Sequence, residues 1–338
     1  MKKHKFLEKL NEDLQKIGDD SNPVLIFGAT GGGKTFFGKW MTEVGILEGH
    51  VKPIWFWCSS PDRFEEMLSF MFPNKVTTTN VKQYMKTGEK PRAFNVAVYI
   101  PVSDNIPNPE KFPANPFETN YSKSGFVPFT IPIDEIEDYA FQVLYGSQES
   151  SSAYREFVKT IERFKRAGRE MSFADFRRLL LAENKTKIRI EKGFQNIPMI
   201  SFSSKVNEPT IVALASRISA LQHEGILSSS RNPYSLSKWL EKELLIQDRI
   251  VILYTGFLRS LQLKYFVLAH FAMTVHKIMQ SVRHKTNFKV QTYFDEVRTL
   301  FPSQHSKSFN ELHKTLMNIS TFLITEGRKV KIEPVFIT

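Results

Sequence analysis

The stretch PVLIFGATGGGKTFFGKW, residues 23–40, decides the fold of this chain. Its first apolar residues, 24–27, have the character of a short buried strand, and residues 34 to about 48 have the apolar spacing of an amphipathic helix. Between them, GATGGGKT matches the complete pattern G-x-x-x-x-G-K-[ST]. Gly28 and Gly33 allow the backbone to turn and to approach a ligand, and the N–H groups of the loop and of the helix start point at one anion. The stretch therefore predicts a phosphate-binding loop.

Two side chains of this loop have predicted roles in binding a nucleotide. Lys34 is expected to reach the β- and γ-phosphates, and Thr35 is expected to offer its hydroxyl to Mg²⁺, which prefers hard oxygen ligands. A glycine-rich turn that happens to contain a lysine is the alternative, and the flanking strand and helix argue against it. The full set of predicted nucleotide-binding residues is Gly28, Ala29, Thr30, Gly31, Gly32, Gly33, Lys34, Thr35 and Phe36.

The second motif of the chain is acidic and follows a predicted strand near the end of the chain. The segment FKVQTYF, residues 288–294, leads directly into Asp295 and Glu296. In nucleotide hydrolases with a phosphate loop, such an Asp holds the Mg²⁺ hydration shell and the adjacent Glu polarises the attacking water. An ordinary acidic pair at the start of a turn is the alternative, and the phosphate loop upstream favours the catalytic interpretation.

Composition limits the class of protein and favours a polyanionic partner. A chain of 338 residues with 41% hydrophobic residues can form one large α/β domain, or a core domain with an inserted subdomain. The net charge of +11 favours nucleic acid or an acidic membrane surface as a partner, although proteins that are merely soluble also carry such charge. The single cysteine, Cys58, excludes an intramolecular disulfide and fits a reducing compartment, with a buried thiol as the expected state.

No targeting or membrane-spanning segment is visible in the sequence. Residues 1–20 form a charged helical pattern without an apolar centre, and the most apolar long segment, 250–275, is interrupted by Arg259 and Lys264. We therefore expect a soluble protein with no membrane span, located in the cytoplasm, or in the host cytoplasm if the source is a virus.

The remaining pattern predicts an α/β core with an insertion. Residues 1–22 contain a short amphipathic helix, and residues 23–132 together with 247–338 form the predicted core, with further strands near 53–58, 94–100, 250–254 and 332–337. The proline-rich part, 101–132, is expected to be an irregular excursion, and 133–246 a helical insertion. A helix predicted from 261 to about 283 places His270 on its buried side, and the spacing of His270 and His276 does not suit a metal site.

The order of these motifs resembles the HerA/FtsK superfamily of P-loop ATPases, most closely the HerA-like branch. The resemblance covers nearly the whole chain from Pro23 onward. It is carried by GATGGGKT at 28–35, IVILYTGFLRSLQLKYFVLAHF at 250–271, YFDE at 293–296 and EGRK at 326–329, and by the inserted segments SFADFRRLL and VALASRISALQ. It implies a P-loop core of the RecA-like ASCE kind, with the catalytic Glu beside the acidic Asp and an extra strand at about 250–254.

The resemblance also implies an activity and a set of partners. Members of this superfamily are ring-forming motors, typically hexameric, that hydrolyse ATP between subunits and move double-stranded DNA through a central pore. By this resemblance the cofactors are ATP and Mg²⁺, Lys34 and Thr35 serve the phosphates and the metal, Asp295 is the metal-linked acid and Glu296 the catalytic base. Arg328 resembles the arginine that is supplied to the neighbouring subunit's nucleotide. A nuclease or a portal protein is a possible accessory partner of such a motor.

Two classes of function remain open from the sequence. One is a motor that translocates duplex DNA in DNA processing, transfer or genome packaging. The other is an assembly or protein-handling factor, or a nucleotide switch, of the same fold. Basic clusters at 163–169 and 185–192 do not decide between them, because each could be a solvated helix face.

Overall fold

The computed structural model describes residues 23–27, 33–57, 68–72, 93–102, 125–136, 138–145, 158, 161–162, 216, 218–228, 235–246, 248–295 and 311–337. The strands are β1 (Val24–Ile26), β2 (Val51–Trp57), β3 (Asn95–Pro101), β4 (Gly125–Phe129), β5 (Ile131–Pro132), β6 (Leu227–Ser228), β7 (Arg249–Tyr254), β8 (Lys289–Phe294) and β9 (Ile332–Ile337). The α-helices are α2 (Lys34–Leu47), α5 (Asp138–Tyr145), α9 (Leu236–Leu244), α10 (Leu261–Val282) and α12 (Glu311–Thr325). The 3-10 helices are η2 (Leu68–Met71), η4 (Ile133–Glu135) and η5 (Gly327–Val330).

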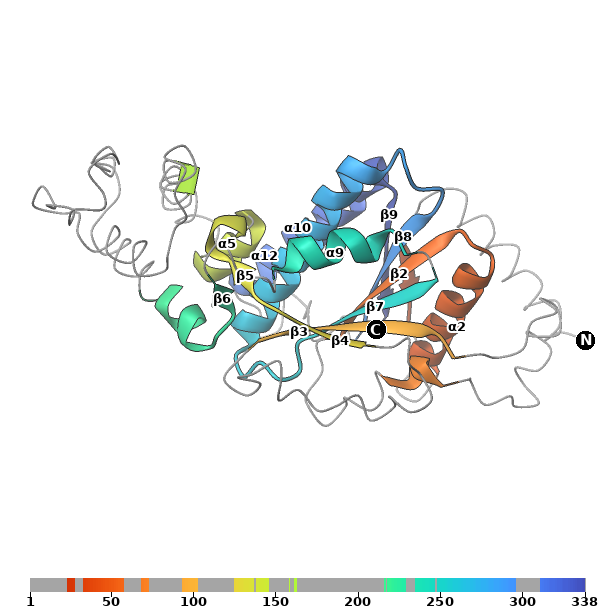
Figure 1. Ribbon diagram of the computed structural model, residues 1–338, viewed down its shortest axis with the longest axis horizontal. Coiled ribbons are helices and arrows are strands. Elements are labelled where there is room, and N and C mark those ends of the chain that lie inside the picture. Colours follow the sequence, from red (N-terminus) through yellow and green to blue (C-terminus); the bar gives the residue numbers. More distant parts are fainter. Residues whose placement is uncertain are drawn as a thin grey trace, which may run out of the picture.

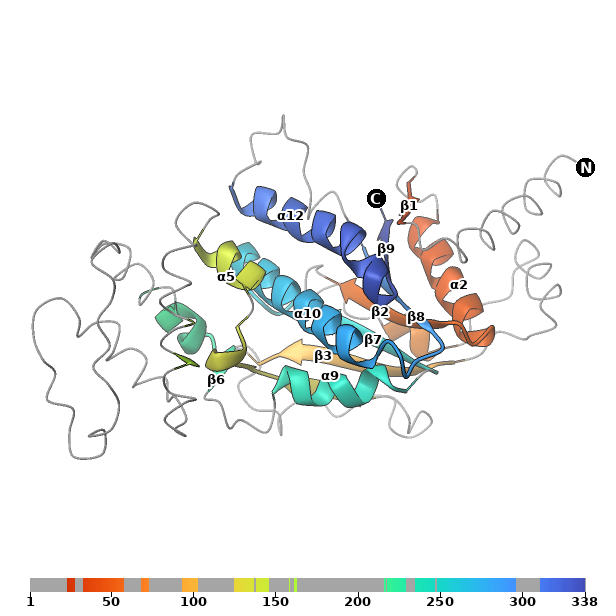
Figure 2. The ribbon, with the colours of Figure 1, turned by 90° about the horizontal axis from the view of Figure 1, so that it is seen from above.

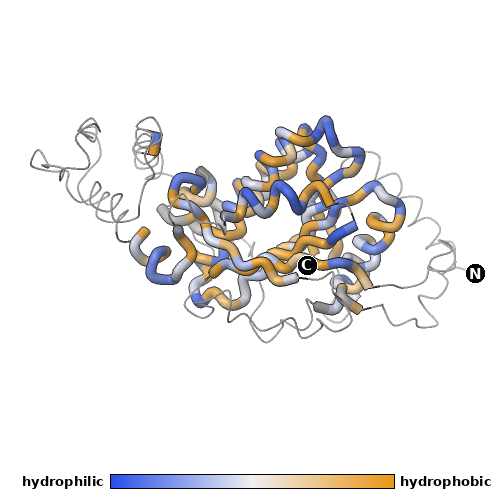
Figure 3. Tube along the Cα trace, in the orientation of Figure 1, coloured by the Kyte–Doolittle hydropathy of each residue, from blue (hydrophilic) through white to orange (hydrophobic). Residues whose placement is uncertain are grey.

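A seven-stranded sheet lies at the centre, with the strand order β1-β9-β8-β2-β7-β3-β4 (Figure 1). All of its neighbouring pairs are parallel. Strands of a parallel sheet are covered on both faces, so they are apolar almost throughout, and every residue of β2 is buried. Figure 3 shows this apolar character along the central strands. The expected α/β fold, a parallel sheet flanked by helices, is confirmed.

Helices cover both faces of the sheet and form two cores. Successive side chains of a strand point to opposite faces, so Trp55 and Trp57 pack with α2 and η2, whereas Ile54 and Phe56 join the core under the remaining helices. That larger core includes buried residues of α5, α9, α10 and α12. Figure 2 shows α10 and α12 running side by side, away from α2. Because α2 begins directly after the phosphate loop, the predicted loop lies at the end of the sheet face that α2 covers.

One strand separates the phosphate-loop strand from the strand that ends at the acidic motif. β9 pairs with β1 on one side, where Ile337 lies opposite Ile26, and with β8 on the other, where Phe336 lies opposite Phe294. Neighbouring strands are about 4.8 Å apart, so the carboxyl ends of β1 and β8 are separated by about 10 Å. The predicted strand at 250–254 is also present, as β7, and lies farther along the sheet between β2 and β3.

Two segments differ from the expectation. The excursion at 101–132 is not irregular throughout, because residues 125–129 form β4 and pair with β3. Pro128 lies in β4, and a proline is tolerated there because β4 is the last strand of the sheet and its outer edge needs no donor. Within 133–246, where we expected helices only, β6 pairs with β5 over two residues, too short a run for periodicity to indicate. The short helix predicted within residues 1–22 and Cys58 lie outside the described residues.

Candidate nucleotide and magnesium site

The start of α2 is shaped to receive an anion. Gly33 has a φ of 81°, a left-handed conformation that favours glycine. Among the described residues beyond its chain neighbours, no heavy atom lies within 4 Å of the position where a Cβ would be. No side chain caps the helix, and no acidic residue lies in its first turn. The N–H groups of a first helical turn need acceptors, and caps or acidic side chains usually provide them. A helix start without a side-chain cap or an acidic residue suits a bound phosphate.

Thr35 and Asp295 bring the phosphate loop and the acidic motif together. The Thr35 hydroxyl donates a hydrogen bond of 3.3 Å to Oδ1 of Asp295. Thr35 is half-buried in the first turn of α2, and Asp295, the residue after β8, is 4% exposed. A hydroxyl and a carboxylate side by side are hard oxygen donors, and Mg²⁺ takes few such ligands from protein and keeps several waters. The residues present therefore fit a Mg²⁺ ion bound together with a nucleotide.

Strand, glycine loop and helix in this order form the P-loop motif. Lys34 is half-buried as the first residue of α2, and Phe36 is exposed within the first turn. The structure thus brings Gly33, Lys34, Thr35 and Asp295 to the same end of the sheet. The predicted residues Gly28 to Gly32 and Glu296 lie outside the described residues.

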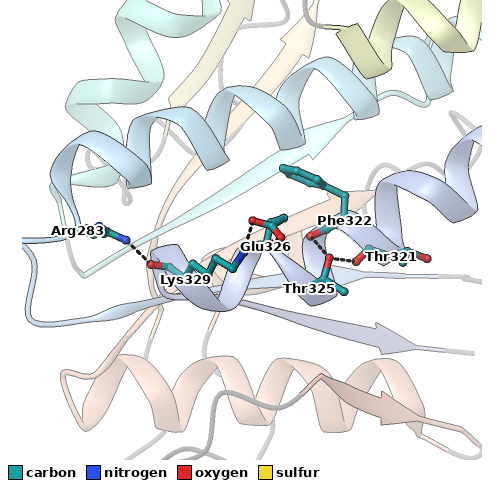
Figure 4. Close-up of polar contacts among 6 residues, drawn as sticks. All are labelled: Arg283, Thr321, Phe322, Thr325, Glu326 and Lys329. Atoms are coloured by element: carbon teal, nitrogen blue, oxygen red, sulfur yellow. Dashed lines mark hydrogen bonds and ion pairs between the residues drawn. The ribbon is translucent and has the colours of Figure 1, made fainter.

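Arg328 lies at the opposite end of the strands from the P-loop. It is an exposed residue of η5, which precedes β9, whereas the loop follows the carboxyl end of the parallel strand β1. The ion pair in this turn joins Lys329 to Glu326 at 2.8 Å, and Arg283 donates to the carbonyl of Lys329 at 2.7 Å (Figure 4). Strand β9 spans about 20 Å, so Arg328 does not serve its own P-loop.

The two histidines of α10 differ in burial. His270 is 1% exposed, and burial, aided by Lys277, lowers its pKa to about 3, so its ring is neutral. His276 is half-buried, and its ring packs edge-on against Phe322 at 4.8 Å between centroids. Both positions agree with the prediction that these histidines are buried or half-buried.

Three comparisons with known proteins were made. No family model and no curated protein matches the sequence. Among solved structures, the chain is similar to the bacterial conjugative coupling protein TrwBdeltaN70, in a trigonal form in complex with sulphate, with 14% sequence identity and a TM-score of 0.49. The match covers 94% of this chain and 63% of that chain, so this chain spans less than two thirds of that protein's length. None of the helices in the described residues is long and apolar enough to cross a membrane.

Sequence reasoning missed three residues at the contact between α2 and the sheet. Thr42, on the helix that carries Lys34 and Thr35, accepts a hydrogen bond from Trp55 of β2, and Trp55 stacks on Tyr293 of β8. A signal for Thr42 does exist in the sequence, because it lies two helical turns after Thr35 and so on the same face. No pattern in the sequence indicates its partners on β2 and β8.

Proposed function

We propose that this protein is an ATP-hydrolysing P-loop motor that works as a ring, typically a hexamer, and binds and translocates double-stranded DNA. The contact between Thr35 and Asp295 is the observation that carries the nucleotide part, since it joins the two motifs such chemistry needs. The family resemblance of the motifs supports the motor. Processing, transfer and packaging of DNA are the settings that fit it, with a nuclease or a portal protein as the accessory partner.

Each site residue has a distinct part in this proposal. Lys34 and the N-terminus of α2 bind the phosphates, with charge-assisted hydrogen bonds from the lysine. Thr35 and Asp295 hold Mg²⁺, which neutralises charge on the phosphates when bound. Glu296 accepts a proton from the attacking water, and Arg328 of a neighbouring subunit stabilises the charge that develops on the transferred group.

The overall charge supports a nucleic-acid partner. A net charge of +11 attracts the phosphate backbone of DNA in a sequence-independent way. Binding releases counterions from the DNA, and because the entropy gained by this release falls as salt rises, the binding weakens. A translocating motor must grip any sequence it meets, so backbone recognition suits its task.

The test is the ATPase rate with and without duplex DNA, together with duplex binding across a salt series. We expect the rate to rise several-fold on addition of duplex, and binding to be independent of base sequence and to weaken steeply with salt. Duplexes of equal length and scrambled sequence serve as the control. Sequence-selective binding, or no binding at low salt, contradicts the motor and favours an assembly factor, a protein-handling factor or a nucleotide switch.

The particle formed with ATP gives an independent test of the ring. With ATP bound, native mass spectrometry is expected to give the mass of a ring-sized oligomer, and electron microscopy is expected to show a closed ring. A monomer under these conditions argues for a nucleotide switch.

A further inference from the structure

Helix α2 rests on the sheet through one face that also carries Thr35. Thr35, Gly38 and Thr42 are three and four residues apart, so they lie on the same side of the helix. At Gly38 a Cβ would lie 2.7 Å from Cδ1 of Ile337 and 3.0 Å from Cη2 of Trp55. The helix axis therefore approaches β2 and β9 more closely at Gly38 than a larger residue would allow.

A buried hydrogen bond fixes the helix one turn beyond this contact. The indole Nε1 of Trp55 donates to the hydroxyl of Thr42 at 3.0 Å, and that hydroxyl donates to the carbonyl of Gly38 at 3.0 Å. Both Thr42 and Trp55 are fully buried. Hydrogen bonds away from water are strong and directional, and leaving a buried donor without its acceptor is unfavourable. The bond therefore holds α2 in one position along β2.

The same tryptophan contacts the strand that ends at Asp295. Trp55 and Tyr293 are paired in register on β2 and β8, and their rings stack at 4.7 Å with an angle of 3° between the planes. The Tyr293 hydroxyl donates to Oε1 of Gln291 at 2.7 Å and lies beside Thr42. Residues two apart on a strand share a face, so Asp295 follows Tyr293 on the α2 side of the sheet.

We infer that Thr42, Trp55 and Tyr293 are positioning residues that hold Thr35 against Asp295 and thereby determine how tightly the site binds Mg²⁺. The inference rests on the proposed nucleotide site. Thr42 lies seven residues beyond Thr35, about 10 Å along the helix, so it acts through the seating of α2 and not by touching the nucleotide. Groups that orient metal ligands commonly change metal affinity by roughly 10- to 100-fold when they are lost.

The test separates nucleotide binding from its dependence on Mg²⁺. A fluorescent ATP analogue is titrated into the wild-type protein and into Thr42→Val, Thr42→Ser and Tyr293→Phe, first in EDTA and then across a Mg²⁺ series. In Thr42→Val we expect unchanged affinity in EDTA and a roughly 10-fold higher Mg²⁺ concentration for half-maximal enhancement of binding. Thr42→Ser keeps the hydroxyl and should behave as the wild type. Tyr293→Phe keeps the stacked ring and should show a shift in the same direction.

Thr274→Val is the matched control. Thr274 is a buried residue of α10, and its hydroxyl donates to the carbonyl of His270 at 2.8 Å. Thr42 makes the equivalent bond, to the carbonyl four residues earlier in its own helix. It lies on the helix that covers the other face of the sheet, so it should leave the Mg²⁺ requirement unchanged even where it lowers the melting temperature.

Three results would overturn the inference. One is that both Thr42→Val and Tyr293→Phe need the same Mg²⁺ concentration as the wild type. Another is that these variants lose affinity for the ATP analogue in EDTA as much as they do in Mg²⁺. The third is an equal shift in Thr274→Val. If Thr42→Val does not fold, the inference is tested by comparing the Mg²⁺ requirement of Tyr293→Phe with that of Thr274→Val. Failure of the wild-type protein to bind the analogue under any condition rejects the nucleotide site itself, and the inference with it.

Discussion

The hydroxyl of Thr35 and the carboxylate of Asp295 lie 3.3 Å apart, although 260 residues separate them in the chain. Their proximity follows from the sheet, because parallel strands β1 and β8 end at the same edge and α2 starts above that edge. Only one strand, β9, lies between β1 and β8. The hydroxyl and carboxylate oxygens that meet here are of the type that Mg²⁺ prefers.

Replacing Lys34 by alanine should abolish nucleotide binding. The variant loses charge-assisted hydrogen bonds to the phosphates, and a loss of about 3 kcal/mol corresponds to roughly 100-fold weaker binding. Titration of a fluorescent ATP analogue measures this. Lys39→Ala is the control on the same helix, since the Lys39 amino group binds Ser69 and lies over the rings of Trp57 and Phe70. Unchanged ATP affinity in Lys34→Ala would show that the loop is not the nucleotide site.

Replacing Glu296 by glutamine should separate binding from hydrolysis. Glutamine keeps the size of the side chain and its hydrogen bonding but cannot accept a proton, so we expect retained ATP binding and hydrolysis lowered at least ~100-fold. Binding and steady-state phosphate release measure the two quantities. Asp295→Asn is the contrasting variant, because it should also weaken the Mg²⁺-dependent part of binding. Hydrolysis near the wild-type rate in Glu296→Gln would assign Glu296 to an ordinary turn.

The sequence predicts those parts of the fold that depend on local pattern. The apolar runs that became β2, β8 and β9 and the periodic segment that became α10 were predicted within a few residues of their observed bounds. Thr35 and Asp295 were assigned to one site because their motifs have defined roles. In these cases residues close together in the chain carry the whole signal.

Contacts between distant segments could not be predicted in this way. β4 was missed because Pro128 and its proline-rich surroundings indicate a loop, and only its edge position makes a strand possible. The bond between Thr42 and Trp55 joins a helix face to a strand, and neither residue shows its partner in the sequence. Lys52 is a further case, because a lysine within a run of buried strand residues is rare and depends on partners elsewhere.

Lys52 is fully buried in β2 and binds the segment that connects α9 to β7. Its amino group donates to the carbonyls of Ile246 and Arg249, each at 2.6 Å, and lies 3.6 Å from a carboxylate oxygen of Glu243. Glu243 also pairs with Arg249 at 3.0 Å. Burial lowers the pKa of Lys52 from 10.5 to about 8, against an opposing effect of Glu243. Removing the charged amino group from water therefore costs free energy, and its hydrogen bonds and Glu243 offset only part of that cost.

This lowered pKa predicts how stability changes with pH. Between pH 8 and 10.5 the unfolded chain binds the Lys52 proton more tightly than the folded chain, so the contribution of Lys52 to stability rises with pH across this window. The full difference corresponds to about 3 kcal/mol. Denaturant unfolding of the wild type and of Lys52→Met should show the difference in free energy of unfolding shifting in favour of the wild type as pH rises. Lys242→Met, at an exposed position on α9, is the control, and its difference from the wild type in free energy of unfolding should not change with pH. If the difference for Lys52→Met also does not change with pH, the prediction is contradicted.

The final prediction is that Arg328 acts on the nucleotide of a neighbouring subunit. The residue is exposed, lies at the end of the sheet opposite the P-loop of its own chain, and follows a turn whose acidic residue, Glu326, is paired with Lys329. A guanidinium supplied by a neighbour neutralises charge on the transferred phosphoryl group, an effect on the order of 10³-fold or more in rate. Arg328→Ala should therefore lower ATP hydrolysis by that order while leaving ATP binding intact. The control is Lys329→Ala, which removes a neighbouring cation and should retain most of the activity.

Mixing two inactive variants distinguishes this role from that of a surface cation. Subunits with Arg328→Ala keep an intact P-loop, and subunits with Lys34→Ala keep an intact arginine. In a mixed ring, some interfaces join the intact loop of one subunit to the intact arginine of the next, so part of the activity should return. Such recovery requires a shared site, because neither variant alone has both groups. Nearly full activity of Arg328→Ala alone, or no recovery where mixed rings are shown to form, means that Arg328 does not act between subunits.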